Sequence, residues 1–144
     1  LENMLAITPA ESVHAFDLAR LKMPEVTCWS AWEGEELLGF GALKFLDDGA
    51  AEIKSMRTSS LHLRKGVARS LLKHILAIAG ARLYRRVYLE TGSSPSFAPA
   101  RSLYRSFGFV FCGPFGEYVP DPNSSFMTLE LHGSQYVLPN AAET

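Results

Sequence analysis

Hydrophobic residues recur along the chain at two spacings, which predict a mixture of strands and helices. Apolar and aromatic runs bounded by turn residues predict strands at 26–32, 37–46, 51–58, 86–91, 109–112 and 126–131. Apolar residues three or four positions apart predict helices at 11–23, 66–79 and 99–107. A hairpin followed by alternating strands and helices indicates a mixed α/β (α+β) fold, with one sheet and helices on its faces.

The same pattern indicates how the chain is organised. No repeat, low-complexity tract or linker divides the 144 residues, so the sequence predicts a single domain over 1–144. Pro24, Gly80 and Gly108 stand where the three helices are expected to end. No strand is readable ahead of Ala10.

Composition narrows the class of protein. With 47% hydrophobic and 20% charged residues, the chain is typical of a globular domain and not of a disordered tail. Its two cysteines, Cys28 and Cys112, are too few for a disulfide scaffold or a Cys-rich zinc site, which favours a reducing, cytoplasmic setting. The four histidines lack metal-ligand spacing, so we expect no metal. No secretory leader is readable and no apolar run approaches the ~20 residues of a membrane span, so we expect no membrane association.

Charge is distributed unevenly along the chain. Residues 54–105 hold eleven Lys or Arg and one Glu, a net charge of +10, whereas the whole chain carries −1. This block favours a compact anionic ligand such as a polyphosphate. A nucleic acid is a poor candidate, because the domain is not basic overall and shows no helix–turn–helix cue. A set of solvated helix faces is the alternative explanation.

The join between the third strand and the long helix carries the strongest sequence signal. Residues 64–69 read RKGVAR, so basic residues surround Gly66 and Ala68 at the start of the helix. The first N–H groups of a helix have no partner within it and, with the helix dipole, favour an anion. Small residues allow a phosphate to approach the backbone. The sequence therefore predicts a pyrophosphate site built from main-chain N–H groups, the alternative being an ordinary basic first turn.

Two motifs resemble those of the GNAT superfamily of N-acetyltransferases. Residues 51–58 (AEIKSMRT) followed by 63–68 (LRKGVA) resemble motif A, and residues 100–109 (ARSLYRSFGF) resemble motif B. The strings EIKSMRT, LETG and DPNS are similar to those of small bacterial members. The chain departs from the usual motif A at Leu63, where Gln or Arg is common. Because the site works through backbone N–H groups, we expect it to tolerate this change.

The resemblance implies both a fold and a co-substrate. The expected fold is a GNAT-type mixed, mostly antiparallel sheet with a central splayed parallel pair, flanked by helices on both faces. Members of the superfamily normally open with a strand before the first helix, so the resemblance implies that this strand is missing or truncated here. The expected co-substrate is acetyl-CoA. The residues that the resemblance assigns to its binding are Met56, Arg57, Thr58, Arg64, Lys65, Gly66, Val67, Ala68 and Arg69.

Acetyl transfer to an amine needs a base, an oxyanion donor and an acid. Tyr104 is the candidate acid, because a phenol can protonate the departing thiolate. The N–H of Met56 is the candidate oxyanion donor. Glu52 is the leading candidate base and Glu90 the alternative, while a chain of water molecules is a third possibility. Each assignment has a structural alternative, since Tyr104 can be a core aromatic and Glu52 can be paired with Lys54.

These observations predict a cytoplasmic acetyl-CoA-dependent N-acetyltransferase that acts on a primary amine by direct transfer in a ternary complex. A catalytically silent acyl-CoA-binding module and a plain phosphoanion-binding domain are the alternatives.

The loop at 113–125 is a candidate wall of the acceptor site, through Glu117 and Asp121, or else a solvated surface loop. A homodimer is compatible with exposed sheet edges. The identity of the amine stays open.

Overall fold

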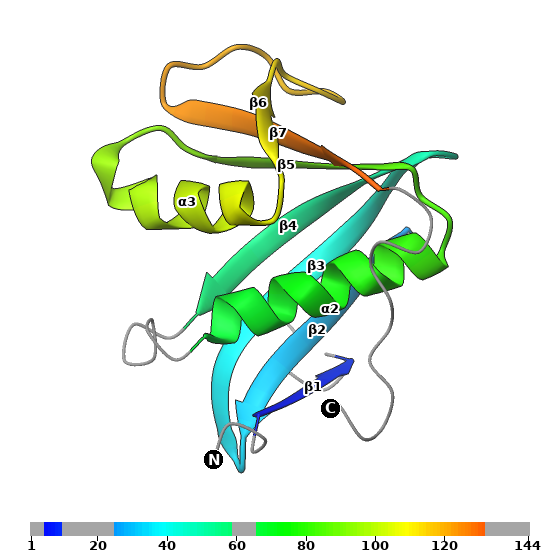
Figure 1. Cartoon of the computed structure of the whole chain (residues 1–144), viewed down its shortest axis with the longest axis vertical. Coiled ribbons are helices and arrows are strands. Elements are labelled where there is room, and N and C mark those ends of the chain that lie inside the picture. The colour runs from blue at the N-terminus through cyan, green and yellow to red at the C-terminus, as the bar shows by residue number, and fades with distance from the viewer. Residues whose placement is uncertain (1–4, 10–24, 59–65, 132–144) are drawn as a thin grey trace.

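The computed structural model describes residues 5–9, 25–58 and 66–131 (Figure 1). Within them, seven strands form one sheet in the order β1-β2-β3-β4-β5-β7-β6. The elements are β1 (Leu5–Pro9), β2 (Val26–Glu33), β3 (Glu36–Asp47), β4 (Ala50–Thr58), α2 (Val67–Ala81), β5 (Arg86–Gly92), the short 3-10 helix η3 (Pro95–Phe97), α3 (Ala98–Ser106), β6 (Val110–Cys112) and β7 (Ser124–Glu130). The six predicted strands and the two later helices are confirmed, with ends that differ by one or two residues.

One pair of neighbouring strands, β4 and β5, is parallel, and the other pairs are antiparallel. The parallel register runs from Ala50 opposite Arg86 to Ile53 opposite Leu89. Both strands continue beyond it, β4 to Thr58 and β5 to Gly92, and Figure 1 shows them turning away from each other. The expected mostly antiparallel sheet with a splayed central parallel pair is therefore confirmed.

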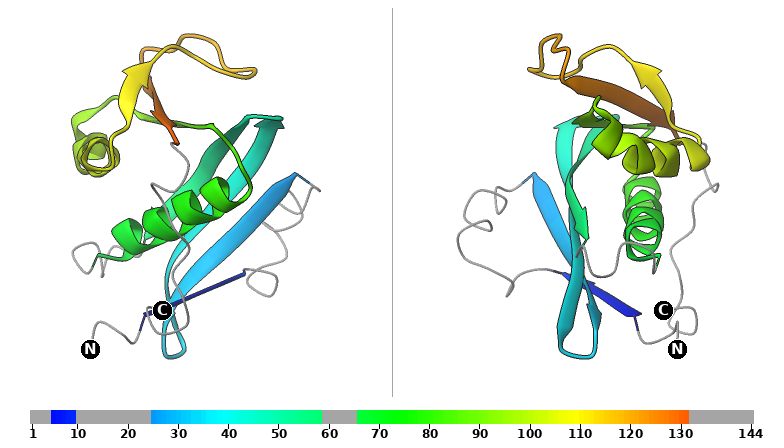
Figure 2. Two further views of the ribbon diagram at one scale, coloured as in Figure 1. Left: turned by 45° about the vertical axis from the view of Figure 1, so that its right-hand side comes forward. Right: turned by 90° about the vertical axis from the view of Figure 1, so that its left-hand side faces the viewer.

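The two described helices pack against one face of the sheet (Figure 2). This inner face carries alternate strand residues, such as Ile53, Leu89 and Met127, which are at most 3% exposed. The α2 helix contributes a buried stripe of Val67, Leu71, Leu72, Ile75, Leu76, Ala77 and Ala79. Helix α3 adds Tyr104 to the same core. The helix predicted at 11–23, which the expectation of helices on both faces requires, lies outside the described residues.

Two glycines of β3 set how closely α2 approaches the sheet. A Cβ at Gly39 would lie 2.9 Å from both Leu71 Cδ1 and Val67 Cγ1, and a Cβ at Gly41 would lie 2.8 Å from Ile75 Cδ1. Neither distance is compatible with normal packing, so any larger residue would push the helix away. These two glycines hold the beginning of α2 against the sheet, next to the end of β4.

The prediction of a missing first strand is wrong, because β1 pairs antiparallel with β2 from Leu5 opposite Glu33 to Pro9 opposite Trp29. The strand has five residues and alternates half-buried Leu5 and Ile7 with exposed neighbours, so its apolar signal is too short to read.

The expected end of the long helix at Gly80 is also wrong. Helix α2 continues to Ala81, and Leu83 then reverses the chain with a φ of 68°. The N–H groups of Leu83 and Tyr84 donate to the carbonyls of Gly80 and Ala79, so this last turn remains hydrogen-bonded.

Candidate active site

The splay between β4 and β5 lies beside the beginning of α2, and a β-bulge in β4 shapes it. Between the pairs Phe40–Arg57 and Ala42–Lys54, a single β3 residue, Gly41, faces both Ser55 and Met56. Ser55 takes a φ of 60°, in the left-handed region that is unusual for a serine. The extra residue interrupts the alternation of side chains along β4.

The bulge changes which face Met56 occupies. A Cβ at Gly41 would meet Met56 Sδ at 2.7 Å on the side where Ile75 of α2 packs, so the Met56 side chain lies on the inner face. Simple alternation predicts Glu52, Lys54, Met56 and Thr58 on one face, and this prediction is wrong from Met56 onward. Arg57, another predicted binding residue, is exposed, and Thr58 is half-buried.

The predicted anion site at the start of α2 has the geometry that an anion requires. Gly66 is the N-cap residue, in the left-handed conformation with φ 76° and ψ 14°. No side chain caps the helix and no acidic residue stands in its first turn. The first helical hydrogen bond runs from the N–H of Ser70 to the carbonyl of Gly66. The N–H groups of Val67, Ala68 and Arg69 therefore have no partner within the helix.

Around Gly66, the described residues leave open the position where a side chain would begin. A Cβ at Gly66 would meet no atom within 4 Å, among the residues that the structure describes. Open space, unpaired N–H groups and the positive end of the helix dipole fit a diphosphate. Arg64 and Lys65, which are also predicted to bind it, lie outside the described residues.

Arg69 joins the two sequence motifs. Its Nη2 donates to Ser106 Oγ at 3.1 Å, and its guanidinium lies 5.1 Å from the centre of the Phe107 ring. The first turn of α2 is thereby tied to the end of α3. Arg69 thus has partners on α3 as well as a place beside the predicted anion site.

Tyr104 lies on the inner face, in the core. Its side chain is 7% exposed, and its ring packs edge-on against Phe109 with the ring centres 5.7 Å apart. Burial raises the pKa of Tyr104 to about 12. The Tyr104 hydroxyl makes no hydrogen bond with any residue in the described ranges. Within the described ranges, the hydroxyl proton is therefore left to a ligand or to solvent.

Glu52 lies on the outer face and is unusually buried for a carboxylate, at 3% exposure. The Tyr118 hydroxyl donates to Glu52 Oε2 at 2.7 Å, and Lys54 Nζ lies 3.9 Å from the same oxygen. The pKa of Tyr118 is raised, first by burial and then by its hydrogen bond to Glu52 and by the charges of Glu52 and Glu90. The predicted ion pair of Glu52 with Lys54 is therefore present, and Tyr118 is a second partner of the same carboxylate.

Glu90 lies on the same face but in a different environment. It is exposed, and its Oε2 accepts a hydrogen bond from Ser124 Oγ at 2.6 Å. Its charge acts on the Tyr118 hydroxyl that also binds Glu52. Both predicted candidate bases, Glu52 and Glu90, therefore lie on the outer face and act on the same tyrosine hydroxyl.

The loop between β6 and β7 supplies aromatic side chains to this face. Phe115 stacks on Tyr88 with ring centres 4.7 Å apart, and Tyr118 packs edge-on against Phe115 and Phe126 at 5.0 and 5.5 Å. The predicted wall at 113–125 is therefore aromatic. Glu117 is exposed and Asp121 accepts from the N–H of Asn123 in its own turn. Sequence analysis missed Phe115 and Tyr118, whose only signal is their place in a long loop.

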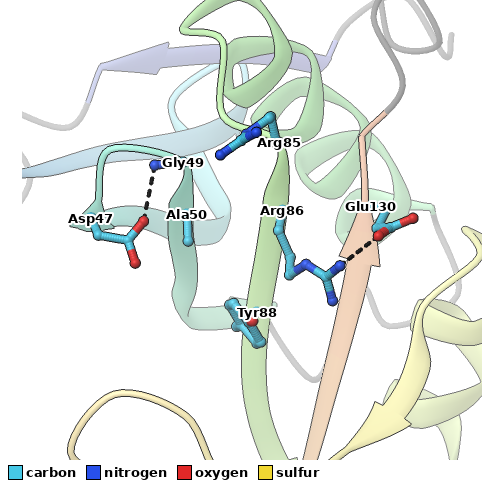
Figure 3. A pocket seen from close by; sticks show the side chains of 7 residues that line it. All are labelled: Asp47, Gly49, Ala50, Arg85, Arg86, Tyr88 and Glu130. Atoms are coloured by element: carbon cyan, nitrogen blue, oxygen red, sulfur yellow. Dashed lines mark hydrogen bonds and ion pairs between the residues drawn. The ribbon is translucent and has the colours of Figure 1, made fainter.

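A pocket of about 350 Å³ opens at the other end of the parallel pair (Figure 3). Its lining residues are Asp47, Gly49, Ala50, Arg85, Arg86, Tyr88 and Glu130. In Figure 3, Arg86 points to Glu130, with which it forms an ion pair. The pocket lies where β4 and β5 begin and are still paired, away from the splay, and its two arginines face two carboxylates. It is therefore a weaker candidate for an anion than the start of α2.

Two further absences bear on the site. The described residues contain no group of three or more His, Cys, Asp or Glu side chains that could hold a metal ion. Neither helix within these ranges has the length and apolar character of a membrane span.

Comparison with known proteins identifies the family of the chain. Residues 3–109 match the Acetyltransferase (GNAT) family. The chain is 59% identical over 131 residues to an uncharacterized N-acetyltransferase, YsnE, of Bacillus subtilis, covering 91% of this chain and 87% of that protein. It is 37% identical over 124 residues to an IAA acetyltransferase of Azospirillum brasilense, covering 85% and 80%.

Solved structures share the fold. The chain superimposes on an acyl-CoA N-acyltransferase of Klebsiella pneumoniae with a TM-score of 0.77 and 26% identity, covering 90% of this chain and 99% of that one. A Bacillus subtilis acetyltransferase in complex with CoA gives a TM-score of 0.73 at 19% identity, covering 89% and 99%. The chain belongs to the GNAT family of acetyltransferases. It is an N-acetyltransferase, and its family implies an acyl-CoA co-substrate.

Proposed function

We propose that the protein transfers the acetyl group of acetyl-CoA directly to a primary amine, with both substrates bound at the splay of β4 and β5. The proposal is supported by three features of the sheet and its first described helix. The N–H groups of Val67 and Ala68 have no partner within α2, Tyr104 belongs to the core on the inner face, and the buried Glu52 lies on the outer face, one residue before the last parallel pair. A diphosphate site, an acid and a base are the parts that the reaction needs.

The start of α2 binds the diphosphate in this proposal. The N–H groups of Val67 and Ala68 donate to it, and Gly66 leaves room for it. Beyond their last parallel pair, Ile53 and Leu89, the two strands have backbone groups that do not bond to each other. These groups are available to the pantetheine arm, and the N–H of Met56 at the bulge is the proposed oxyanion donor.

Glu52 is the proposed base. It takes a proton from the amine, whose nitrogen then attacks the thioester carbonyl to form the C–N bond. Tyr118 holds one carboxylate oxygen at 2.7 Å, which fixes the orientation of the group. Glu90 and the aromatic wall of Tyr88, Phe115 and Tyr118 suit a cationic amine, because carboxylates and ring faces both attract an ammonium. Glu90 is the proposed orienting residue.

Tyr104 is the proposed acid. Because its pKa is raised to about 12, the phenol remains protonated at neutral pH. Its hydroxyl donates to the sulfur as the C–S bond breaks and the thiolate forms.

Two measurements test this proposal. A screen of acetyl-CoA with a library of amines should show release of free thiol with a subset of them. Thermal unfolding should show greater stabilisation by CoA and acetyl-CoA than by ATP, because stabilisation follows ligand affinity. Binding of CoA without turnover of any amine would contradict the catalytic part, and stabilisation by ATP alone would contradict the whole.

A further inference from the structure

Lys54 lies beside Glu52, at the place where the proposed reaction needs an acceptor amine. Lys54 is the first β4 residue beyond the last parallel pair with β5, Ile53 opposite Leu89, so it lies at the mouth of the splay. Its side chain is on the outer face, because its Nζ lies 3.9 Å from Glu52 Oε2. Glu52 is the proposed base, and the outer face is the one from which the proposed acceptor amine approaches it.

The contacts of Lys54 match those that an acceptor would make. Its Nζ lies 6.0 Å from the centre of the Tyr118 ring, so the ammonium faces both a buried carboxylate and an aromatic side chain. The Lys54 side chain is 33% exposed, so the amine is partly withdrawn from water. Among the lysines of the described ranges, Lys44, Lys54 and Lys73, it is the one within 4 Å of a carboxylate.

We propose that Lys54 is a self-acetylation site, whose Nζ accepts the acetyl group of bound acetyl-CoA when no other amine competes. This inference rests on the proposed function. Glu52 removes a proton from Nζ, the nitrogen attacks the thioester carbonyl, and the C–N bond of an acetyl-lysine forms. The C–S bond breaks, and the sulfur leaves as the thiol of CoA after taking up a proton. No oxidant or further reactant is needed.

Acetylation would change the charges of the outer face. The amide of acetyl-Lys54 has no positive charge, so it loses the ion pair with Glu52 and the cation–π contact with Tyr118. The carboxylate of Glu52 then keeps the Tyr118 hydroxyl as its partner. An amine that arrives from solution must displace the Lys54 ammonium, and it competes with this residue for the same base.

The experiment incubates the full chain with isotope-labelled acetyl-CoA and no added amine, then maps labelled peptides by mass spectrometry. Lys54 should be labelled at least tenfold faster than the exposed Lys73, at a rate that does not change when the protein is diluted tenfold. Glu52→Gln should slow the labelling of Lys54 at least tenfold. The label should disappear in Lys54→Arg and persist at Lys54 in the matched control Lys73→Arg.

Two outcomes overturn the inference: no label at Lys54, or labelling no faster than at Lys73. The melting temperature and CoA affinity of Lys54→Arg establish that this variant is folded. The amine screen, run on the same preparation, separates the two proposals. Amine turnover with an unlabelled Lys54 refutes self-acetylation alone, whereas absence of both reactions refutes the proposed function as well.

Discussion

On the inner face of the sheet, β4 and β5 present Ile53 and Leu89, which are 3% and 1% exposed among apolar side chains. Glu52 and Glu90, the sequence neighbours of Ile53 and Leu89, lie on the outer face. Their carboxylates accept hydrogen bonds from Tyr118 and Ser124, respectively. The same two strands therefore offer an apolar surface to the helices and a charged surface to the β6–β7 loop. This follows from the alternation of side chains along a strand.

The difference between the faces separates the two proton transfers. The proposed acid, Tyr104, belongs to the inner face, where burial keeps its phenol protonated. The proposed base, Glu52, belongs to the outer face, where a hydrogen bond and a nearby lysine accompany its carboxylate. In the proposed reaction, the acid and the base therefore act from opposite faces of the sheet.

The two carboxylates of the outer face provide the largest expected contrast. Glu52→Gln should lower kcat/KM for the amine about 100-fold near neutral pH, because it removes the base, and the deficit should shrink as pH rises and the amine loses its proton unaided. Glu90→Gln, the matched control, should lower it less than about tenfold. Steady-state kinetics from pH 6 to 10 give both values. Equal losses in the two variants would contradict the assignment of the base.

On the inner face, Tyr104→Phe keeps the ring and removes the hydroxyl. We expect kcat to fall about tenfold or more, with KM for acetyl-CoA nearly unchanged, because the lost interaction forms as the thiolate leaves. The melting temperature should change little, since the hydroxyl has no partner among the described residues. A variant with the kcat of the unaltered protein would exclude Tyr104 from the mechanism.

The proposed diphosphate site lies at the start of α2, where Gly66 is the N-cap residue. Gly66→Ala should destabilise the protein by about 1 kcal/mol, because φ is 76° there. It should also weaken CoA binding about fivefold, which corresponds to about 1 kcal/mol, because the new Cβ enters the open space before α2. Gly34→Ala is the matched control, with a φ of 60° and open space in the β2–β3 turn. Calorimetry should show unchanged CoA affinity in the control, and equal weakening would contradict the site.

A further contrast concerns stability in alkali. The pKa of Tyr104 is raised from 10 to about 12 in the folded chain, so the native state keeps a proton that the unfolded state loses. This stabilisation is complete below pH 10 and is lost as pH rises to 12. The melting temperature of Tyr104→Phe should therefore fall less steeply over this range than that of the unaltered protein. Parallel curves for the two proteins would contradict the raised pKa.

Most of the fold could be predicted from the sequence, because it depends on local patterns. The helix α2 repeats apolar residues at helical spacing, and β4 and β5 are short apolar runs between turns. The strand β1 escaped prediction, since its five residues contain only Leu5 and Ile7 as half-buried apolar positions. Its place in the sheet comes from pairing with β2, which is a long-range contact that no local pattern encodes.

The candidate site was predictable only in part. Gly66, Glu52 and Tyr104 stand within motifs, so the sequence alone singles them out. Tyr118 was not predictable, because its hydroxyl reaches Glu52 across 66 positions of the chain. The face of Met56 was predicted wrongly, since the alternation rule assumes a regular strand and the bulge at Ser55 breaks it.

That bulge also divides β4 into two segments of opposite phase. Up to Lys54, even-numbered side chains point to the outer face, whereas Met56 packs beside Gly41 under the helix. Without the bulge, regular alternation would point Met56 to the outer face, whereas deleting Ser55 would restore an uninterrupted ladder with β3 and leave Met56 on the inner face. Building the proposed site into another sheet would therefore require the bulge as well as the side chains. In a perfectly regular strand, the side chains keep the same alternation between the two faces along its whole length.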